Sequence, residues 1–212
     1  MHKPKAVLFD WDNTIADTWP VIYKALHKTF EDFGLIPWSF EETKLRVAKS
    51  MRDSFPELFG RDRLEEAMLA YRRNYNAFSH DLYPIFDGAR ELLAHLQNEG
   101  IYTAVVSNKT GAILRHETDS LDMTKLFNKV IGSLDAKRDK PFPDPVYLAL
   151  DGSNIEPSQE VWFIGDSHVD VDCAYNTNCF PVFFGDNDDH LEKKAKLVVN
   201  HHDKLKQIIS EL

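Results

Sequence analysis

The stretch KAVLFDWDNT, residues 5–14, decides the fold. Four apolar residues, Ala6 to Phe9, follow one another and stop at Asp10, which is typical of a short strand buried on both faces. Such a strand indicates a parallel sheet between two layers of helices. Because open sheets of this kind bind ligands beyond the carboxyl ends of their strands, we expect Asp10 and the residues after it to line a site.

The rest of the chain after about residue 83 alternates between helix and strand patterns. Since alternating elements imply parallel pairing with helices on both faces, we predict a doubly wound α/β core. The second strand is expected to end at Ser107. The predicted strands are 101–106, 129–132, 161–164, 180–184 and 197–199, and the predicted helices are 87–99, one from Thr110, one around 145–150, 169–175 and 204–209.

Residues 17–82 contain no predicted strand. Asp17 to Phe33 carries apolar residues at three- and four-residue spacing and is followed by Gly34, which predicts an amphipathic helix that ends there. The pattern then stays helical and becomes more polar, most clearly over residues 61–78. We therefore predict a core made of residues 1–16 and 83–212, with an α-helical cap domain of residues 17–82 inserted after the first strand.

Composition and charge exclude several classes of protein. The 212 residues include 25 Lys and Arg against 34 Asp and Glu, a formal charge of −9, which disfavours a general nucleic-acid binder. We find no signal peptide and no apolar stretch of membrane-spanning length. The two cysteines, Cys173 and Cys179, predict buried thiols rather than a disulfide framework. We expect a soluble cytoplasmic monomer or homodimer that acts on a small molecule, with neither nucleic acid nor membrane as partner.

Four segments that follow predicted strands, or lead away from them, bring reactive side chains to one edge of the sheet. Clustered carboxylates raise one another's pKa unless a cation joins them, and a hard ion with oxygen ligands such as Mg²⁺ fits best. A serine beside backbone N–H groups can bind phosphoryl oxygens, and a lysine adds positive charge. Such a set suits phosphoryl transfer through a carboxylate nucleophile. The residues are Asp10, Asp12, Thr14, Ser107, Asn108, Lys140, Asp166 and Asp170.

Each segment taken alone also has a structural interpretation. Residues 12–14 can form a turn that leads into a helix, Ser107 and Asn108 can cap a helix, and Lys140 can be an ordinary surface lysine. The arrival of all four segments at one edge, in one chain, favours a functional site.

Together the four segments resemble the motifs of the haloacid dehalogenase-like (HAD) hydrolase superfamily. Residues 10–14, Asp-Trp-Asp-Asn-Thr, are similar to its DxDx[TV] motif, and residues 105–108 are similar to its motif of apolar residues followed by [ST]-N. Lys140 is similar to its isolated lysine, and residues 163–170 to its GDxxxD motif. The resemblance runs through the whole chain in order and implies a Rossmann-like core with bound Mg²⁺.

Two further segments resemble the phosphoglycolate phosphatase-like branch, namely residues 140–145, Lys-Pro-Phe-Pro-Asp-Pro, and residues 86–88, Phe-Asp-Gly. The predicted insertion at 17–82 lies where that branch carries its small helical cap. Residues 47–51 lack the glycine-rich turn common in the branch, which argues against phosphoglycolate itself as the substrate.

The resemblance implies a role for each residue. Asp10 would be the nucleophile that forms an aspartyl-phosphate. Asp12 would protonate the leaving oxygen and then activate water, while its backbone carbonyl helps to hold the metal. The metal would be bound by Asp10, Asp166 and Asp170, and the phosphoryl group by Ser107 and Asn108. Thr14 would contribute to substrate binding through the loop geometry. Lys140 would stabilise the nucleophile and the phosphate.

Asp12 distinguishes a phosphatase from a dehalogenase. Dehalogenases of the superfamily lack this second aspartate, because a halide needs no proton to leave, so we predict a phosphatase acting on a small phosphorylated metabolite. The motifs do not exclude a pyrophosphatase or a sugar-phosphate mutase, because both enzymes keep the same residues. A non-catalytic phospho-aspartate switch or binding protein is a further alternative, although a receiver-type switch needs only about half this length.

A basic cluster in the predicted cap consists of Arg46, Lys49 and Arg52. We expect one or more of these residues to contact the non-reacting end of an anionic substrate. A solvated helix face is an equally good interpretation.

Overall fold

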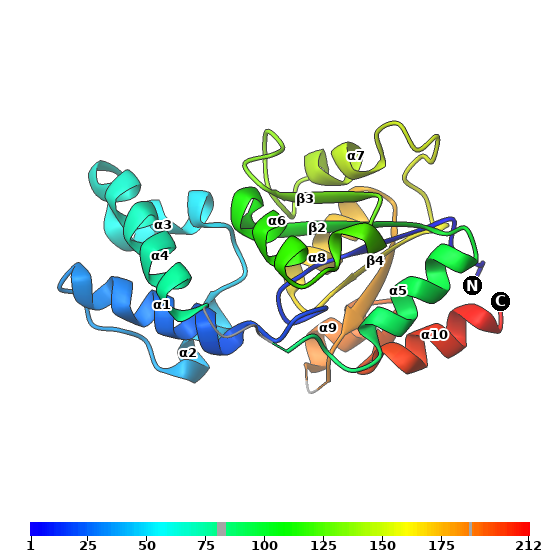
Figure 1. The fold of residues 1–212 in the computed structure, drawn as a ribbon, viewed down its shortest axis with the longest axis horizontal. Coiled ribbons are helices and arrows are strands. Elements are labelled where there is room, and N and C mark those ends of the chain that lie inside the picture. Colours follow the sequence, from blue (N-terminus) through cyan, green and yellow to red (C-terminus); the bar gives the residue numbers. More distant parts are fainter. Residues whose placement is uncertain (80–83, 187) are drawn as a thin grey trace.

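The structure, a computed structural model, describes residues 1–79, 84–186 and 188–212 (Figure 1). Within these residues one parallel sheet has the strand order β3-β2-β1-β4-β5-β6, which is the doubly wound order of nucleotide-binding folds. This confirms the predicted Rossmann-like α/β class. The strands are β1 (Ala6–Phe9), β2 (Tyr102–Thr110), β3 (Lys129–Ser133), β4 (Val161–Gly165), β5 (Phe180–Phe184) and β6 (Leu197–Val199).

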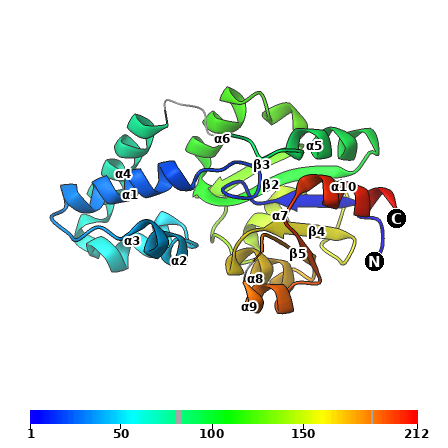
Figure 2. The same cartoon turned by 90° about the horizontal axis from the view of Figure 1, so that it is seen from below.

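Helices cover both faces of the sheet, as Figure 2 shows. The core helices are α5 (Ala89–Asn98), α6 (Gly111–Ser120), α7 (Asp144–Leu150), α8 (His168–Asn176), α9 (Asp189–Lys194) and α10 (His202–Ser210), with a 3₁₀ turn at Thr124–Leu126. One apolar cluster joins the sheet to α5, α6 and α10, and a second joins it to α7 and α8. The sheet is therefore buried on both sides, as the uninterrupted apolar strands predict.

Strand β1 lies in the middle of the sheet and fixes the position of the site. All four of its residues are fully buried. Phe9 pairs with Val105 of β2 on one side and with Ile164 of β4 on the other. The Asp10 backbone N–H then donates to the Ile164 carbonyl oxygen at 2.8 Å, so the loop after β1 begins at the carboxyl edge of its neighbours.

The second strand is longer than predicted. β2 continues past Ser107 to Thr110, and its register with β3 shifts between Val106 and Thr110. The polar side chains after Val106 suggested a strand end, but the backbone resumes parallel pairing when Thr110 meets Ser133. Such an irregularity redirects side chains near a site, and both Ser107 and Asn108 line the cavity described below.

Four helices lie together beside the carboxyl edge of the sheet (Figure 1). They are α1 (Trp19–Asp32), α2 (Phe40–Arg46), α3 (Met51–Phe59) and α4 (Leu64–Phe78), with a 3₁₀ turn at Arg61–Arg63. Leu26, Phe30, Phe55, Phe59 and Ala67 form a separate apolar cluster among them. The domain boundaries stay a prediction, and the one between residues 82 and 83 falls outside the described residues. In the part of the chain that is described, we find no helix with the length and apolar character needed to cross a membrane.

Candidate active site

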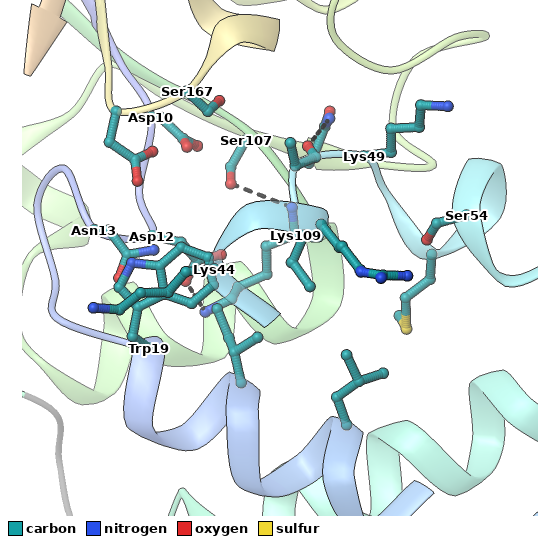
Figure 3. A pocket seen from close by; sticks show the side chains of 18 of the residues that line it. Asp10, Asp12, Asn13, Trp19, Lys44, Lys49, Ser54, Ser107, Lys109 and Ser167 are labelled. Atoms are coloured by element: carbon teal, nitrogen blue, oxygen red, sulfur yellow. Dashed lines mark hydrogen bonds and ion pairs between the residues drawn. The ribbon is translucent and has the colours of Figure 1, made fainter. Parts of the chain in front are cut away.

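A cavity of about 490 Å³ lies between the carboxyl edge of the sheet and the four helices α1–α4 (Figure 3). The core contributes charged and polar side chains to it, and the helices contribute mostly apolar ones. Among the lining residues are Asp10, Asp12, Ser107, Lys140 and Asp166, which lie in the four segments expected to meet at this edge of the sheet. The topology therefore brings these residues into one cavity.

Lys140 is buried between two carboxylates. Its Nζ lies 2.9 Å from Asp10 Oδ1 and 2.7 Å from Asp170 Oδ1, and its side chain is 1% exposed. Burial alone would lower the pKa of Lys140, but the two carboxylates outweigh it and hold that pKa above its usual range. The lysine is thus a permanent cation beside the candidate nucleophile.

Three carboxylates gather at the ends of β1 and β4. Asp10, Asp166 and Asp170 each offer an oxygen, and these oxygens lie within 4.8 Å of one another. Burial raises the pKa of Asp166 well above its ordinary value, and the negative charges of Asp170 and Asp10 raise it further. Gly165 permits this crowding, because a Cβ there would lie 2.2 Å from Asp170 Cγ. The three carboxylates face only one ammonium, that of Lys140, so the cluster has excess negative charge when no metal is bound.

This donor set fits Mg²⁺. Hard oxygen ligands and excess negative charge are what that ion requires. The two Asp170 oxygens already accept hydrogen bonds, Oδ1 from Lys140 and Oδ2 from the Ser167 backbone N–H at 3.0 Å. Metal binding stays a prediction for these residues, and these contacts favour Asp10 and Asp166 as direct ligands and Asp170 as a residue that orients its neighbours.

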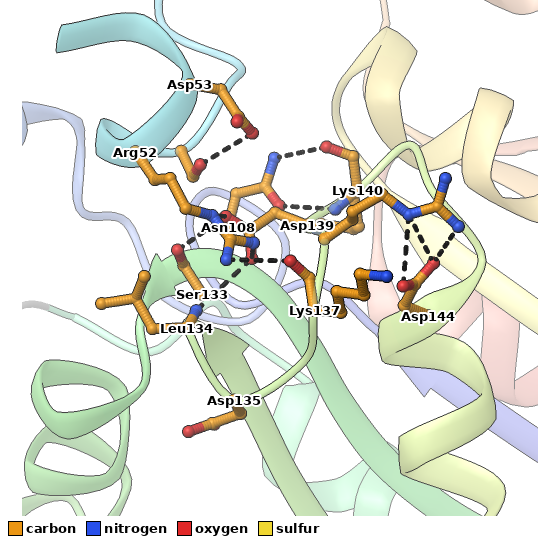
Figure 4. Close-up of polar contacts among 12 residues, drawn as sticks. Arg52, Asp53, Asn108, Ser133, Leu134, Asp135, Lys137, Asp139, Lys140 and Asp144 are labelled. Carbon is orange, nitrogen blue, oxygen red and sulfur yellow. Dashed lines mark hydrogen bonds and ion pairs between the residues drawn. The ribbon is translucent and has the colours of Figure 1, made fainter. Parts of the chain in front are cut away.

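Ser107 and Asn108 line the same cavity as Asp166. Ser107 is buried at the cavity, where its Oγ accepts a hydrogen bond from the Lys109 backbone N–H. The Asn108 amide bridges two segments: it donates to the carbonyl oxygens of Ala48 and Lys140, both at 3.1 Å, and it accepts from the Lys140 backbone N–H (Figure 4). Phosphoryl binding stays a prediction for both residues.

Thr14 is fully buried and does not line the cavity. It lies in the loop between Asp10 and Ala16, where Asn13 adopts a left-handed conformation with φ 58°. The Asn13 N–H donates to the Ala16 carbonyl oxygen at 2.7 Å and closes the loop. This place fits a supporting role for Thr14 in the loop better than contact with a substrate.

The three basic residues of the predicted cap divide into two groups. Arg46 and Lys49 are exposed and line the cavity. Arg52 instead contacts the core, where its Nη2 lies 2.7 Å from Oδ1 of the buried Asp139 and its Nη1 donates to the Lys137 carbonyl oxygen (Figure 4). Arg52 therefore attaches α3 to the segment that carries Lys140.

A second buried lysine, Lys109, was not predicted from the sequence. Lys109 Nζ lies 2.6 Å from Asp12 Oδ1 and 2.7 Å from Oε2 of the buried Glu117. Burial raises the pKa of Asp12, and the Lys109 ammonium opposes that rise. Two signals were available: Lys109 directly follows the Ser-Asn pair, and Glu117 lies three residues after Leu114 and four before Leu121, on the apolar side of α6.

The chain is similar to known proteins. A family model described as "Haloacid dehalogenase-like hydrolase" matches residues 7–183. A protein of Caldanaerobacter subterraneus subsp. tengcongensis that bears the name "Putative pyrophosphatase PpaX" is 34% identical over 178 residues, which cover 80% of this chain and 76% of that protein. Phosphoglycolate phosphatase of Pseudomonas putida is 25% identical over 194 residues, covering 87% of this chain and 71% of the relative.

A solved structure agrees with the same assignment. The crystal structure of a HAD-superfamily hydrolase from Ehrlichia chaffeensis has a TM-score of 0.67 and 31% identity, and the match covers 100% of this chain and 98% of that one. The matched segment contains every site residue named above, in the order that the motifs require. This chain is therefore an enzyme of the haloacid dehalogenase-like hydrolase family.

Proposed function

We propose that the enzyme is an Mg²⁺-dependent phosphatase that hydrolyses a small phosphorylated metabolite through an aspartyl-phosphate. The observation that carries the proposal is the pair of carboxylates after β1, which occupy one cavity but have different partners. Asp10 is paired with Lys140, and Asp12 with Lys109. A nucleophile that must stay ionised and a neighbour that must carry a proton need such separate environments.

In the first step an Asp10 carboxylate oxygen attacks phosphorus, and the bond from phosphorus to the ester oxygen breaks. The leaving oxygen takes a proton from Asp12 and departs as an alcohol. Lys140 stays beside Asp10 and balances negative charge on the transferring group. Ser107 Oγ and nearby backbone N–H groups would bind the phosphoryl oxygens.

In the second step water attacks the aspartyl-phosphate and gives its proton to Asp12, which is now ionised. The bond between phosphorus and the Asp10 oxygen breaks and inorganic phosphate leaves. Both carboxylates return to their starting states. Mg²⁺, held by Asp10 and Asp166, would neutralise phosphoryl charge and fix the orientation of the group.

The cavity supports an organic phosphate with an apolar part. Half-buried Trp19, Trp38, Met51 and Tyr71 form part of its wall on the helical side. Pyrophosphate and phosphoglycolate, the compounds in the relatives' names, have little surface for such a wall to cover. Exposed basic residues at the cavity edge would contact a second polar group of the substrate.

The two cysteines indicate where the enzyme works. Cys173 and Cys179 are both free and buried, as predicted, which supports a reducing compartment such as the cytoplasm. We propose a monomer or homodimer that binds small phosphorylated compounds, with neither nucleic acid nor membrane as partner.

The first test measures phosphate release from 4-nitrophenyl phosphate, with and without Mg²⁺, for wild type and for Asp10→Asn. We expect turnover by wild type only with the metal, and a folded but inactive variant. Equal activity of the two proteins would remove Asp10 as nucleophile. A chain inert toward a broad set of phosphates would favour the switch or binding-protein alternative, while release from pyrophosphate alone, or transfer between sugar positions, would favour the pyrophosphatase or the mutase.

A further inference from the structure

We infer that Glu117, Lys109 and Tyr75 form a buried positioning network that fixes the carboxylate of Asp12, and that the network is complete only when α4 is docked on the core. The inference rests on the proposed function, in which Asp12 transfers the proton. None of these three residues carries a role in the motifs that define the site.

The Glu117 carboxylate is almost entirely enclosed, with a side-chain exposure of 2%. Its Oε1 accepts from the Tyr75 hydroxyl at 2.7 Å and from Lys109 Nζ at 2.9 Å. Its Oε2 accepts from Trp11 Nε1 and from Lys109 Nζ, both at 2.7 Å. Both oxygens of this buried charge are thus satisfied, and Trp11 connects them to the loop that carries Asp10 and Asp12.

Lys109 connects the buried Glu117 carboxylate to Asp12 in the active site. Its side chain is 5% exposed, and its Nζ contacts the carboxylates of Glu117 and Asp12 and the hydroxyl of Tyr75. The same oxygen, Asp12 Oδ1, also accepts from the Thr18 hydroxyl at 2.6 Å. Two donors therefore hold the Asp12 carboxylate. Glu117 does not line the cavity, so it acts on the reaction through its neighbours, chiefly Lys109 and also Trp11.

Stability alone is a poor reason for this network. Replacing a buried ion pair by apolar residues of similar size is often neutral or stabilising, whereas removing one partner is costly. An apolar residue at 117 would suit the apolar side of α6. A charged residue there is explained by its effect on Lys109, which balances two carboxylates at once.

Tyr75 connects the network to the helical segment. It lies on α4 and is 1% exposed, and its hydroxyl reaches Lys109 on β2 and Glu117 on α6. Movement of α4 away from the core would remove this hydroxyl from both partners. Docking of the helices would then bring Asp12 into its working position at the moment when the cavity encloses the substrate.

The test compares leaving groups, because proton donation matters most when the departing oxygen is basic. We would measure kcat and KM with 4-nitrophenyl phosphate and with an alkyl phosphate for wild type, Glu117→Gln and Tyr75→Phe. General acid catalysis contributes about 10²–10⁴-fold, so mispositioning Asp12 is expected to lower kcat for the alkyl ester about 10- to 100-fold. The kcat for the nitrophenyl ester should fall by about threefold or less, with KM little changed for either ester.

Asn74→Ala is the matched control. Asn74 is buried on the same helix as Tyr75, but its side chain donates to Thr29 and Asp32 on α1, away from Asp12. This variant should melt at a lower temperature and keep the wild-type ratio of the two kcat values. An unchanged ratio in Tyr75→Phe and in folded Glu117→Gln would overturn the inference. If Glu117→Gln does not fold, Tyr75→Phe alone decides. Failure of the proposed function is visible separately, as an inert wild type or an active Asp10→Asn.

Discussion

At the residue scale, two buried lysines organise the site, and each is shared by two carboxylates. Lys140 lies between Asp10 and Asp170, and Lys109 lies between Asp12 and Glu117. In each pair of carboxylates one lines the cavity beside the reacting group, and the other, deeper one holds the lysine in place. The candidate nucleophile and the candidate acid therefore face different cations, although only one residue separates them in the chain.

Lys140→Met is expected to damage both stability and activity. Removing one partner of a buried ion pair costs about 3–5 kcal/mol, because here Asp10 and Asp170 would stay buried without their cation. Thermal melting should show a lower midpoint, and phosphate release should fall at least about 100-fold, since the charge on the transferring group loses its fixed counterion. The exposed Lys137, three residues earlier, provides the control Lys137→Met, which should match wild type. A folded and active Lys140→Met would contradict the arrangement.

Much of the site was predictable from sequence because strand ends in a parallel sheet must converge. Asp10, Lys140 and Asp166 meet in the cavity as that rule requires. The orientation of individual side chains was not predictable, because it depends on partners far away in the chain. Asn108 turns toward the backbone of Lys140, and Arg52 toward Asp139, and neither partner could be read from local spacing.

At the element scale, the predicted strands and helices are mostly present, and the differences have local causes. Apolar runs and amphipathic periods are strong signals, and they placed β1 and α1 within two residues. α9 was missed because its six residues, Asp189–Lys194, contain one apolar side chain, Leu191. The continuation of β2 was missed because its last residues are polar and their pairing with β3 is irregular.

The contact of α3 with the core leads to a prediction about closure. Arg52 is the partner of a buried carboxylate, Asp139, whose Oδ2 otherwise accepts from the Ser133 hydroxyl at 2.8 Å. In Arg52→Met this carboxylate loses its cation, which favours separation of α3 from the core. We expect an increase in KM of about tenfold, with a smaller change in kcat, and faster proteolysis of the helical segment. Arg61→Met, at an exposed position in the same segment, is the control. Unchanged KM and proteolysis would show that the ion pair does not hold the helices.

At the scale of the whole molecule, the last helix, α10, packs on one face of the sheet and buries a histidine there. His202 at the start of α10 is 1% exposed, and its ring lies 4.5 Å from that of Phe184 and 6.4 Å from that of Phe86, measured between centroids. Burial lowers the pKa of His202 to about 4. The folded protein therefore keeps this ring neutral under conditions in which the unfolded chain would protonate it.

The lowered pKa of His202 predicts that acid reduces the free energy of unfolding. An unfolded histidine binds its proton near pH 6.5, so the unfolded state takes up more protons between about pH 6.5 and 4, and the free energy of unfolding falls as the pH is lowered through that range. The full effect is about 3 kcal/mol at 1.36 kcal/mol per pH unit. Urea unfolding at several pH values should show this loss in wild type, and in His116→Gln at an exposed histidine, but not in His202→Phe. Equal pH dependence in all three would contradict the assignment.

The excess negative charge at the site predicts that the melting temperature of the protein depends on bound metal. Asp10, Asp166 and Asp170 repel one another when no metal is bound, because the single ammonium of Lys140 does not balance three carboxylates. Mg²⁺ should raise the melting temperature of wild type, because a ligand that binds only the folded state stabilises it by about 2.7 kcal/mol at 100 times its Kd. Asp166→Asn removes one of the three charges, so in EDTA this variant should melt above wild type, and added Mg²⁺ should raise its melting temperature much less. Asp62→Asn, at an exposed position far along the chain from the cluster, should behave like wild type in both conditions. If Asp166→Asn gained as much from Mg²⁺ as wild type does, Asp166 would not be a ligand, and the crowding of these carboxylates would need another explanation.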